Sequence, residues 1–128
     1  MTAMEKIVKK YTESHEWITV EGEIATVGVT THAQDELGDI VYVELPAVDK
    51  EVSAGNEAVV LESTKAAADV YAPIGGKIVT VNEKLTAAPE TVNADPEGDG
   101  WLFKMEVADV SQVDALMDEA AYKAMVGK

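Results

Sequence analysis

Glu62-Ser63-Thr64-Lys65-Ala66-Ala67-Ala68-Asp69 is the stretch that decides the fold, because two short runs of strand-forming residues flank it. The run Ala-Val-Val-Leu over residues 58–61 leads into it, and Asp-Val-Tyr-Ala over residues 69–72 leads away and ends at Pro73. Valine and tyrosine favour strands, and proline cannot continue a hydrogen-bonded ladder. We therefore predict a β-hairpin over about residues 58–72 with Lys65 at or near its turn.

The sequence around Lys65 suits a lysine that another enzyme has to reach. Small residues follow it and hydroxyl residues precede it, so no bulky neighbour in sequence can fold over its ammonium group. Position alone favours the plainer interpretation, a solvated turn lysine. The rest of the chain has to decide between the two interpretations.

Composition limits the classes of protein to consider. The chain has 128 residues, which predicts one domain spanning residues 1–128. It has no cysteine, so it has no disulfide framework and no thiolate ligand, and His15 and His32 without clustered partner ligands predict no metal site. The formal net charge is −14 and all ten cationic residues are lysines. This charge argues against nucleic acid as a partner and favours basic protein surfaces.

The N-terminus and the hydropathy pattern give an expected location. No apolar run is long enough to span a membrane, and residues 1–5 lack the apolar core of a signal peptide. Glu5 is an early acid of the kind that transit peptides avoid. We expect a cytoplasmic protein that does not bind membranes, or a mitochondrial matrix protein if the chain is a processed organellar form.

The remaining pattern predicts an all-β fold with helical additions. Strands are expected at residues 16–21, 24–29, 40–45, 77–81 and 101–107, and residues 82–100 are expected to be mostly loop. A short helix is expected near residues 32–37. Thr31 would be its N-cap, paired with Gln34 in a capping box, and Gly38 would end it.

The C-terminal segment predicts one or two helices over residues 112–126. Ser111 is the expected N-cap, and Asp118 is a second candidate N-cap that would divide the segment, so a continuous and a broken helix both remain open. Apolar residues recur at helical spacing and are expected to pack on the sheets: Val113, Leu116, Met117, Ala120, Ala121, Ala124 and Met125.

Several separate motifs give the chain a resemblance to the glycine cleavage system H proteins, from about Tyr11 to about Met125. They are Ser14-His15-Glu16-Trp17; Val27-Gly28-Val29-Thr30 with His32-Ala33-Gln34; residues 37–46 (LGDIVYVELP); residues 62–73 (ESTKAAADVYAP); Val81-Asn82; and Gly100-Trp101. All of them occur in the family order, which makes the match specific. Thr91 and Glu97 depart from the family pattern, which has an aliphatic and often an aromatic residue there, and this concerns local packing only.

The resemblance implies a lipoyl-domain-like barrel-sandwich hybrid of two small antiparallel sheets with an added C-terminal helix. It implies lipoate in amide linkage on Lys65 of a monomeric, non-catalytic carrier. The arm would accept an aminomethyl group from glycine decarboxylase, present it to a tetrahydrofolate-dependent aminomethyltransferase and be reoxidised by dihydrolipoyl dehydrogenase. A lipoate ligase or a lipoyl or octanoyl transferase would load it.

The resemblance also implies a resting place for the loaded arm, lined by Ser14, Glu16 and Asp69. A carboxylate would hold the protonated amine of the load, and burial would keep water from the reactive carbon. Glu62, three residues before the lysine, is a candidate for recognition by the modifying enzyme. The plain alternative is that Glu16 and Asp69 are solvated acids at strand ends.

Four other functions remain open from the sequence. A biotinyl carrier usually has methionines beside its lysine, where this chain has Thr64 and Ala66. A lipoyl domain of a 2-oxo acid dehydrogenase shows Thr-Asp before the lysine, where this chain has Ser63-Thr64. An H-like protein that donates lipoate to other enzymes would use the same lysine. A plain interaction domain would carry no prosthetic group.

Overall fold

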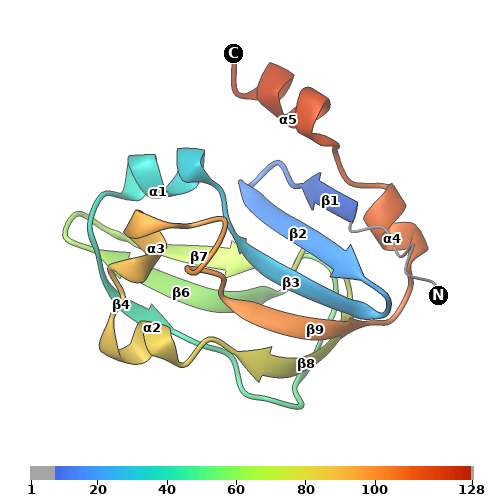
Figure 1. Cartoon of the computed structure of the whole chain (residues 1–128), viewed down its shortest axis with the longest axis horizontal. Coiled ribbons are helices and arrows are strands. Elements are labelled where there is room, and N and C mark those ends of the chain that lie inside the picture. The colour runs from blue at the N-terminus through green and yellow to red at the C-terminus, as the bar shows by residue number, and fades with distance from the viewer. Residues whose placement is uncertain (1–7, 128) are drawn as a thin grey trace.

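The computed structural model describes residues 8–127, which form nine strands and five short helices (Figure 1). The strands are β1 (Val8–Tyr11), β2 (Glu16–Glu21), β3 (Ile24–Val29), β4 (Ile40–Glu44), β5 (Glu51–Val52), β6 (Glu57–Ser63), β7 (Ala67–Tyr71), β8 (Gly76–Val81) and β9 (Phe103–Val107). The helices are α1 (Thr31–Leu37), α2 (Lys84–Ala87), α3 (Thr91–Ala94), α4 (Ser111–Asp114) and α5 (Glu119–Met125).

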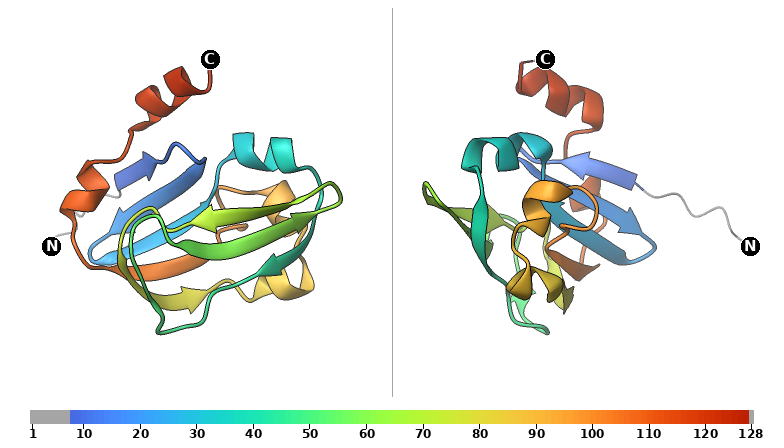
Figure 2. Two further views of the ribbon diagram at one scale, coloured as in Figure 1. Left: turned by 180° about the vertical axis from the view of Figure 1, so that it is seen from behind. Right: turned by 60° about the vertical axis from the view of Figure 1, so that its left-hand side comes forward.

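The strands form two sheets in which every pairing is antiparallel. The larger sheet has the order β1-β2-β3-β9-β8-β5 and the smaller one has the order β4-β6-β7. The sheets lie face to face without closing into a barrel, and helices α1, α2 and α3 lie at one end of them (Figure 2). This arrangement confirms the predicted all-β fold with two antiparallel sheets and helical additions.

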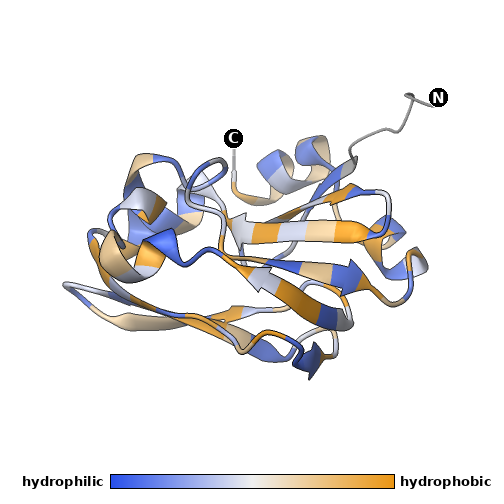
Figure 3. Cartoon of the chain, turned by 60° about the horizontal axis from the view of Figure 1, so that its bottom comes forward, coloured by the Kyte–Doolittle hydropathy of each residue, from blue (hydrophilic) through white to orange (hydrophobic). Residues whose placement is uncertain are grey.

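The main core lies between the two sheets and explains why these sequences form strands. In β6 and β9 buried side chains alternate with more exposed ones, and Figure 3 shows apolar and polar residues mixed along the strands. Leu61 on β6 and Ile78, Phe103 and Met105 on β8 and β9 have no exposed surface. Burying each such side chain stabilises the fold by about 1.5–3 kcal/mol, so the core fixes the sheets as a rigid base for the hairpin.

A second, aromatic cluster attaches the C-terminal helix to the outer strands. Tyr11 and Tyr122 stack with ring centroids 4.7 Å apart, and Trp17 is 97% buried beside them. Trp17 lies on Gly28, where an added Cβ would meet the indole ring at 2.7 Å, and its Nε1 donates a hydrogen bond to the Pro96 carbonyl at 3.0 Å. The cluster therefore requires glycine at position 28.

Two predicted helix caps are wrong by a residue. Thr30, not Thr31, is the N-cap of α1, because its Oγ1 accepts the hydrogen bond from Ala33 N at 3.2 Å. Ser111 is the first residue of α4 rather than its cap. The carboxylate of Asp109 accepts hydrogen bonds from the Ser111 N–H and hydroxyl instead, which lowers the pKa of Asp109.

Most of residues 82–100 is loop, as predicted, but the region also contains the short helices α2 and α3, which the sequence did not indicate. Each helix buries one side chain, Leu85 and Val92 respectively, in the main core. A single buried residue per four-residue helix leaves no periodic pattern for the sequence to show.

The C-terminal segment is broken at Asp118, whose side chain caps α5 by accepting a hydrogen bond from Ala121 N at 2.9 Å. The predicted apolar stripe is correct only before this break: Val113 is buried, and Leu116 and Met117 are half-buried. Four stripe residues in α5 are exposed, namely Ala120, Ala121, Ala124 and Met125. The Asp118 cap begins the separate helix α5, whose buried residue is Tyr122.

The structure bears on the expected absence of a membrane span but not on the expected absence of a leader peptide. Residues 1–5, on which the expectation of no leader peptide rests, lie outside the described residues. Over residues 8–127, no helix has both the length and the apolar character needed to cross a membrane.

Candidate functional site

The hairpin of β6 and β7 presents Lys65 at its tip. Ser63 N donates to the Ala66 carbonyl at 2.8 Å, and the Ser63 hydroxyl accepts hydrogen bonds from the backbone N–H groups of Lys65 at 3.1 Å and Ala66 at 3.0 Å. These bonds fix the backbone on both sides of the lysine while its side chain stays exposed. The hairpin tip in Figure 2 extends beyond the smaller sheet at the same end as α1.

The segment between α1 and β4 supports the lysine from below. Thr64 N donates to the Asp39 carbonyl at 3.1 Å, which ties the hairpin turn to this segment. Gly38 has φ +81°, and a Cβ added to it would lie 3.3 Å from Cε of Lys65. Glycine therefore suits this position for two reasons: it adopts a positive φ without strain, and it has no side chain to press on the lysine chain.

Asn93 on α3 holds this supporting segment in place, a role that the sequence did not reveal. Its Oδ1 accepts a hydrogen bond from Ile40 N at 2.8 Å, and its Nδ2 donates to the Gly38 carbonyl at 2.8 Å and to Gln34 Oε1 at 2.7 Å. One amide thus connects the end of α1, Gly38 and the start of β4. Sequence patterns could not indicate this, because the partners lie 53 to 59 residues away.

The structure brings the three predicted cleft residues together. Ser14, Glu16 and Asp69 line one cavity of about 280 Å³ between β7, α1 and the turn before β2. Its walls also include Leu37 from α1 and Leu61 from β6, whose place in the cavity the sequence did not indicate. Glu62 is exposed and lies outside this cavity. It is on β6, where it pairs with Tyr42 of the neighbouring strand β4.

Glu16 is buried and fully engaged, unlike the solvated strand-end acid of the alternative interpretation. It is 2% exposed, and its Oε1 accepts hydrogen bonds from the hydroxyls of Thr12 and Ser14. Its Oε2 accepts a hydrogen bond from Tyr71 N at 3.1 Å, at the open edge of β7. Glu16 therefore joins the turn before β2 to the hairpin strand, whereas Asp69 is exposed at the cavity rim.

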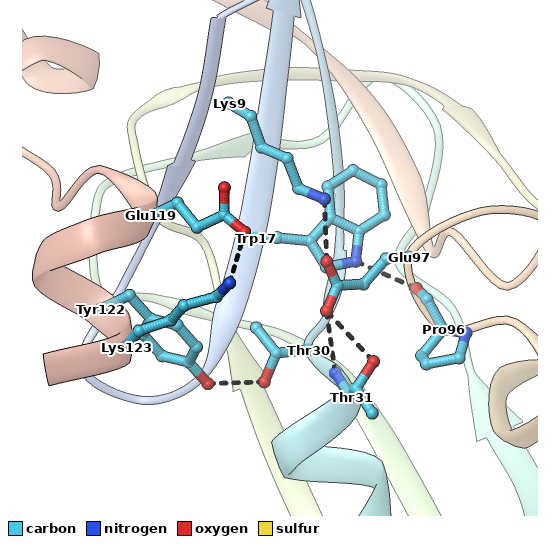
Figure 4. A network of polar contacts seen from close by, with 9 residues as sticks. All are labelled: Lys9, Trp17, Thr30, Thr31, Pro96, Glu97, Glu119, Tyr122 and Lys123. Atoms are coloured by element: carbon cyan, nitrogen blue, oxygen red, sulfur yellow. Dashed lines mark hydrogen bonds and ion pairs between the residues drawn. The ribbon is translucent and has the colours of Figure 1, made fainter. Parts of the chain in front are cut away.

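A hydrogen-bonded chain connects the cavity to the C-terminal helix, and Figure 4 shows its contact between Tyr122 and Thr30. His15, which lines the cavity at φ +72°, has its Nδ1 2.8 Å from the hydroxyl oxygen of Tyr122. That hydroxyl lies 2.7 Å from Oγ1 of Thr30, the N-cap of α1. Burial raises the pKa of Tyr122 above its ordinary value, against the opposing effect of the Thr30 hydrogen bond. The phenol therefore acts as a neutral link between α5 and α1.

Glu97, which departs from the family pattern, forms an ion pair at the start of α1 (Figure 4). Its Oε1 lies 2.8 Å from Nζ of Lys9, and its Oε2 accepts hydrogen bonds from the Thr31 N–H at 3.0 Å and hydroxyl at 3.3 Å. Burial alone would raise the pKa of Glu97, but these partners lower it below its ordinary value. Burial opposes a charged Lys9 as well, yet Glu97 raises the pKa of Lys9.

The two histidines are engaged in structural contacts. Their rings lie 4.5 Å apart, and Nε2 of His32 is 3.2 Å from the Glu36 carboxylate. Over the part of the chain that the structure describes, no group of three or more His, Cys, Asp or Glu side chains is placed to hold a metal ion.

Two facing antiparallel sheets with an exposed lysine at a hairpin tip are the architecture of a lipoyl-type domain. Comparison with known proteins narrows this class: the model of the family described as "Glycine cleavage H-protein" matches residues 9–128. The chain belongs to the glycine cleavage H-protein family.

Relatives and a solved structure agree with this family. The glycine cleavage system H protein of Thermotoga maritima is 59% identical over 116 residues, covering 91% of this chain and 94% of that protein. The one of Phenylobacterium zucineum is 53% identical over 117 residues, covering 91% and 97%. A crystal structure of the H protein from Mycobacterium marinum superposes with a TM-score of 0.85 at 36% identity, covering 94% of this chain and 97% of that one.

Proposed function

We propose that this chain is the lipoyl carrier of a glycine cleavage system and bears lipoate in amide linkage on Lys65. The arm accepts an aminomethyl group from glycine decarboxylase and presents it to the tetrahydrofolate-dependent aminomethyltransferase. Dihydrolipoyl dehydrogenase then reoxidises it. The chain supplies the attachment point, the rigid base and the docking surfaces, and the partner enzymes supply the catalysis.

The observation that carries this proposal is the geometry of Lys65. Its side chain is exposed at the tip of a hairpin whose backbone is held by Ser63 and by the Asp39 carbonyl. Gly38 leaves room beneath the lysine chain. A swinging arm needs an accessible nitrogen on a fixed base, because a mobile base would spread the arm over unproductive positions.

We further propose that the cavity lined by Ser14, Glu16 and Asp69 shelters the loaded arm. Its apolar walls suit the hydrocarbon part of lipoate, and the exposed carboxylate of Asp69 is placed to attract the protonated amine of the load. Glu16 already accepts three hydrogen bonds, so its principal role is to fix the wall of the cavity, and its negative charge adds to the attraction. Exclusion of water protects the aminomethyl carbon from hydrolysis.

The loading enzyme is a lipoate ligase or a lipoyl or octanoyl transferase, and Glu62 contributes to its recognition of the hairpin. The carrier acts as a monomer in the cytoplasm. These assignments rest on family membership and on the exposed position of Glu62 next to the hairpin turn.

Intact-mass measurement after incubation with lipoate, ATP and a lipoate ligase tests the attachment site. We expect the wild-type chain to gain the mass of one lipoyl group and Lys65→Arg to gain none. Lys77→Arg, which removes another exposed lysine, is the matched control and should be modified like the wild type. A lipoyl group on the Lys65→Arg protein would contradict the assignment.

A further inference from the structure

The edge strand β4 exposes two neighbouring apolar side chains beside the lysine hairpin. Val41 is 53% exposed and Tyr42 is 50% exposed, although consecutive residues of a regular strand point to opposite faces. The pairing with β6 explains this: Ile40 pairs with Ser63 and Tyr42 with Glu62, so Val41 is the extra residue of a β-bulge. The bulge turns both side chains toward solvent.

The position of this pair relates it to Lys65. Tyr42 pairs across the ladder with Glu62, and Ile40, the residue before the exposed pair, pairs with Ser63. Glu62 and Ser63 immediately precede the turn that carries the lysine. Asp39, two residues before Val41, accepts the hydrogen bond from Thr64 N. In the left panel of Figure 2 the smaller sheet lies in front, and no other part of the described chain covers its outer face.

Acidic side chains surround the exposed pair. Asp39 precedes Val41, Glu44 follows on the same face of β4 as Tyr42, and Glu62 lies opposite Tyr42 on β6; all three are exposed. The full chain carries a formal charge of −14. A complementary partner surface would therefore have an apolar recess with lysine or arginine around it.

We propose that Val41 and Tyr42, with their acidic rim, form the docking surface for the enzyme that acylates Lys65. The proposal rests on the proposed function of Lys65. In this step the deprotonated Nζ attacks the carbonyl of an acyl adenylate made from lipoate and ATP. An amide forms, the bond between the acyl carbon and the phosphate oxygen breaks, AMP leaves, and the proton that the nitrogen loses goes to solvent.

The short reach of an unmodified lysine favours this occupant over the enzymes that the loaded arm visits. A lysine side chain spans only about 6 Å from Cα to Nζ, so an enzyme that acts on Nζ has to contact the surface around the hairpin. A specific interface covers about 800 Å² of each partner, which extends beyond the tip to the neighbouring β4. The lipoylated arm is much longer and lets later enzymes bind with their active sites farther away.

The test compares steady-state lipoylation of the apo-protein by lipoate ligase with ATP. We expect Val41→Ser with Tyr42→Ser to raise the KM for the protein substrate at least tenfold with little change in kcat, because the apolar anchor is lost and the chemistry is not. Val41→Lys places a positive charge against the basic rim expected on the enzyme, so it should raise the KM for the protein substrate further. Val110→Ser is the control, since Val110 is 63% exposed at the N-cap of α4, at the other end of the molecule (Figure 1). Its KM should stay within twofold of wild type.

A second measurement separates the loading enzyme from the other partners. Each variant is loaded fully with excess ligase, its lipoyl disulfide is reduced to the dithiol with a phosphine, the phosphine is removed, and reoxidation by dihydrolipoyl dehydrogenase is then measured. We expect reoxidation rates within twofold of wild type. A double variant with the wild-type KM for lipoylation, or one whose lipoylation and reoxidation fall equally, would overturn the docking surface. Failure of the wild-type chain to accept lipoate would instead refute the proposed function of Lys65.

Discussion

At the residue scale, the Glu97 carboxylate gives a pH-dependent contribution to stability. The pKa of Glu97 is lowered in the folded chain, so its contribution is fully present above the unfolded pKa. It is lost as the pH falls through the folded pKa. We expect Glu97→Gln to lower the free energy of unfolding by about 1 kcal/mol at pH 7, because the charge faces Lys9 and the first turn of α1.

Urea unfolding at pH 7 and pH 3 measures this difference. The gap between wild type and Glu97→Gln should narrow at pH 3, where the carboxylate is largely protonated in the unfolded chain and increasingly so in the folded one. Lys9→Met is the matched control and should reduce the effect of the Glu97 substitution at pH 7. An equal gap at both pH values would show that the charge of Glu97 contributes nothing.

Gly38 makes a second residue-scale prediction that concerns the site directly. Its φ of +81° disfavours alanine, and an added Cβ would press on Cε of Lys65 at 3.3 Å. We expect Gly38→Ala to cost about 1 kcal/mol of stability and also to slow lipoylation, because the lysine chain has to move. Gly55→Ala has a similar φ of +88° with open space around it, so it should lower stability without slowing lipoylation. Equal lipoylation rates for both variants would contradict a supporting role for Gly38.

At the element scale, α3 acts on the lysine hairpin through Asn93. Removing its amide breaks three hydrogen bonds to Gln34, Gly38 and Ile40. We expect Asn93→Ala to lower the free energy of unfolding by about 2–3 kcal/mol, measured by urea unfolding. Hydrogen exchange should also quicken at the N–H groups of Ile40 and Thr64, which this segment holds. Unchanged exchange at both groups would mean that Asn93 does not hold the segment.

The attachment of α5 gives a matching prediction. The Tyr122 hydroxyl contacts both His15 and Thr30, so Tyr122→Phe should cost about 1–2 kcal/mol while keeping the ring stack on Tyr11. Tyr42→Phe removes a hydroxyl from an exposed ring and is the control, with an expected change below about 0.5 kcal/mol. Thermal unfolding measures both. Equal effects of the two substitutions would contradict the link through Tyr122.

The sequence predicted those elements whose signals are local. Strand-forming residues on both sides of Lys65 indicated the hairpin, and the bonds of Ser63 that close its turn join residues close in sequence. Asp118 was visible as a possible cap, but only the folded chain shows that it ends one helix and begins the next. The exposed alanines of α5 were misassigned because the stripe assumed one continuous helix. Helices α2 and α3 were missed because each buries a single side chain.

The candidate site was predictable only in part for a related reason. Ser14, Glu16 and Asp69 line one cavity, and their role in sheltering the loaded arm stays a prediction. The full engagement of Glu16 with Thr12, Ser14 and Tyr71 was not visible, since it depends on the turn before β2 reaching the edge of β7. The bulge at Val41 was also missed, because a register shift is a property of the paired strands.

At the scale of the whole molecule, the net charge of −14 predicts how the partners meet this chain. Amide formation on Lys65 removes one positive charge and takes the formal value to −14 − 1 = −15. Charge complementarity acts mainly on association rates, and salt screens exposed charges beyond about 8 Å at physiological ionic strength. We expect affinity for the decarboxylase or the aminomethyltransferase to fall with added salt through slower association. Stopped-flow rates that do not change with ionic strength would assign the acidic surface to solubility alone.

Exchange of the glycine carboxyl group with labelled bicarbonate, catalysed by glycine decarboxylase, tests the central claim most directly. The exchange requires an arm that accepts the aminomethyl group and returns it. We predict rapid exchange with the lipoylated wild-type chain, and exchange at the background rate of the decarboxylase alone with Lys65→Arg carried through the same lipoylation step. Exchange with the folded Lys65→Arg protein at the wild-type rate would contradict the account of Lys65 as the carrier residue.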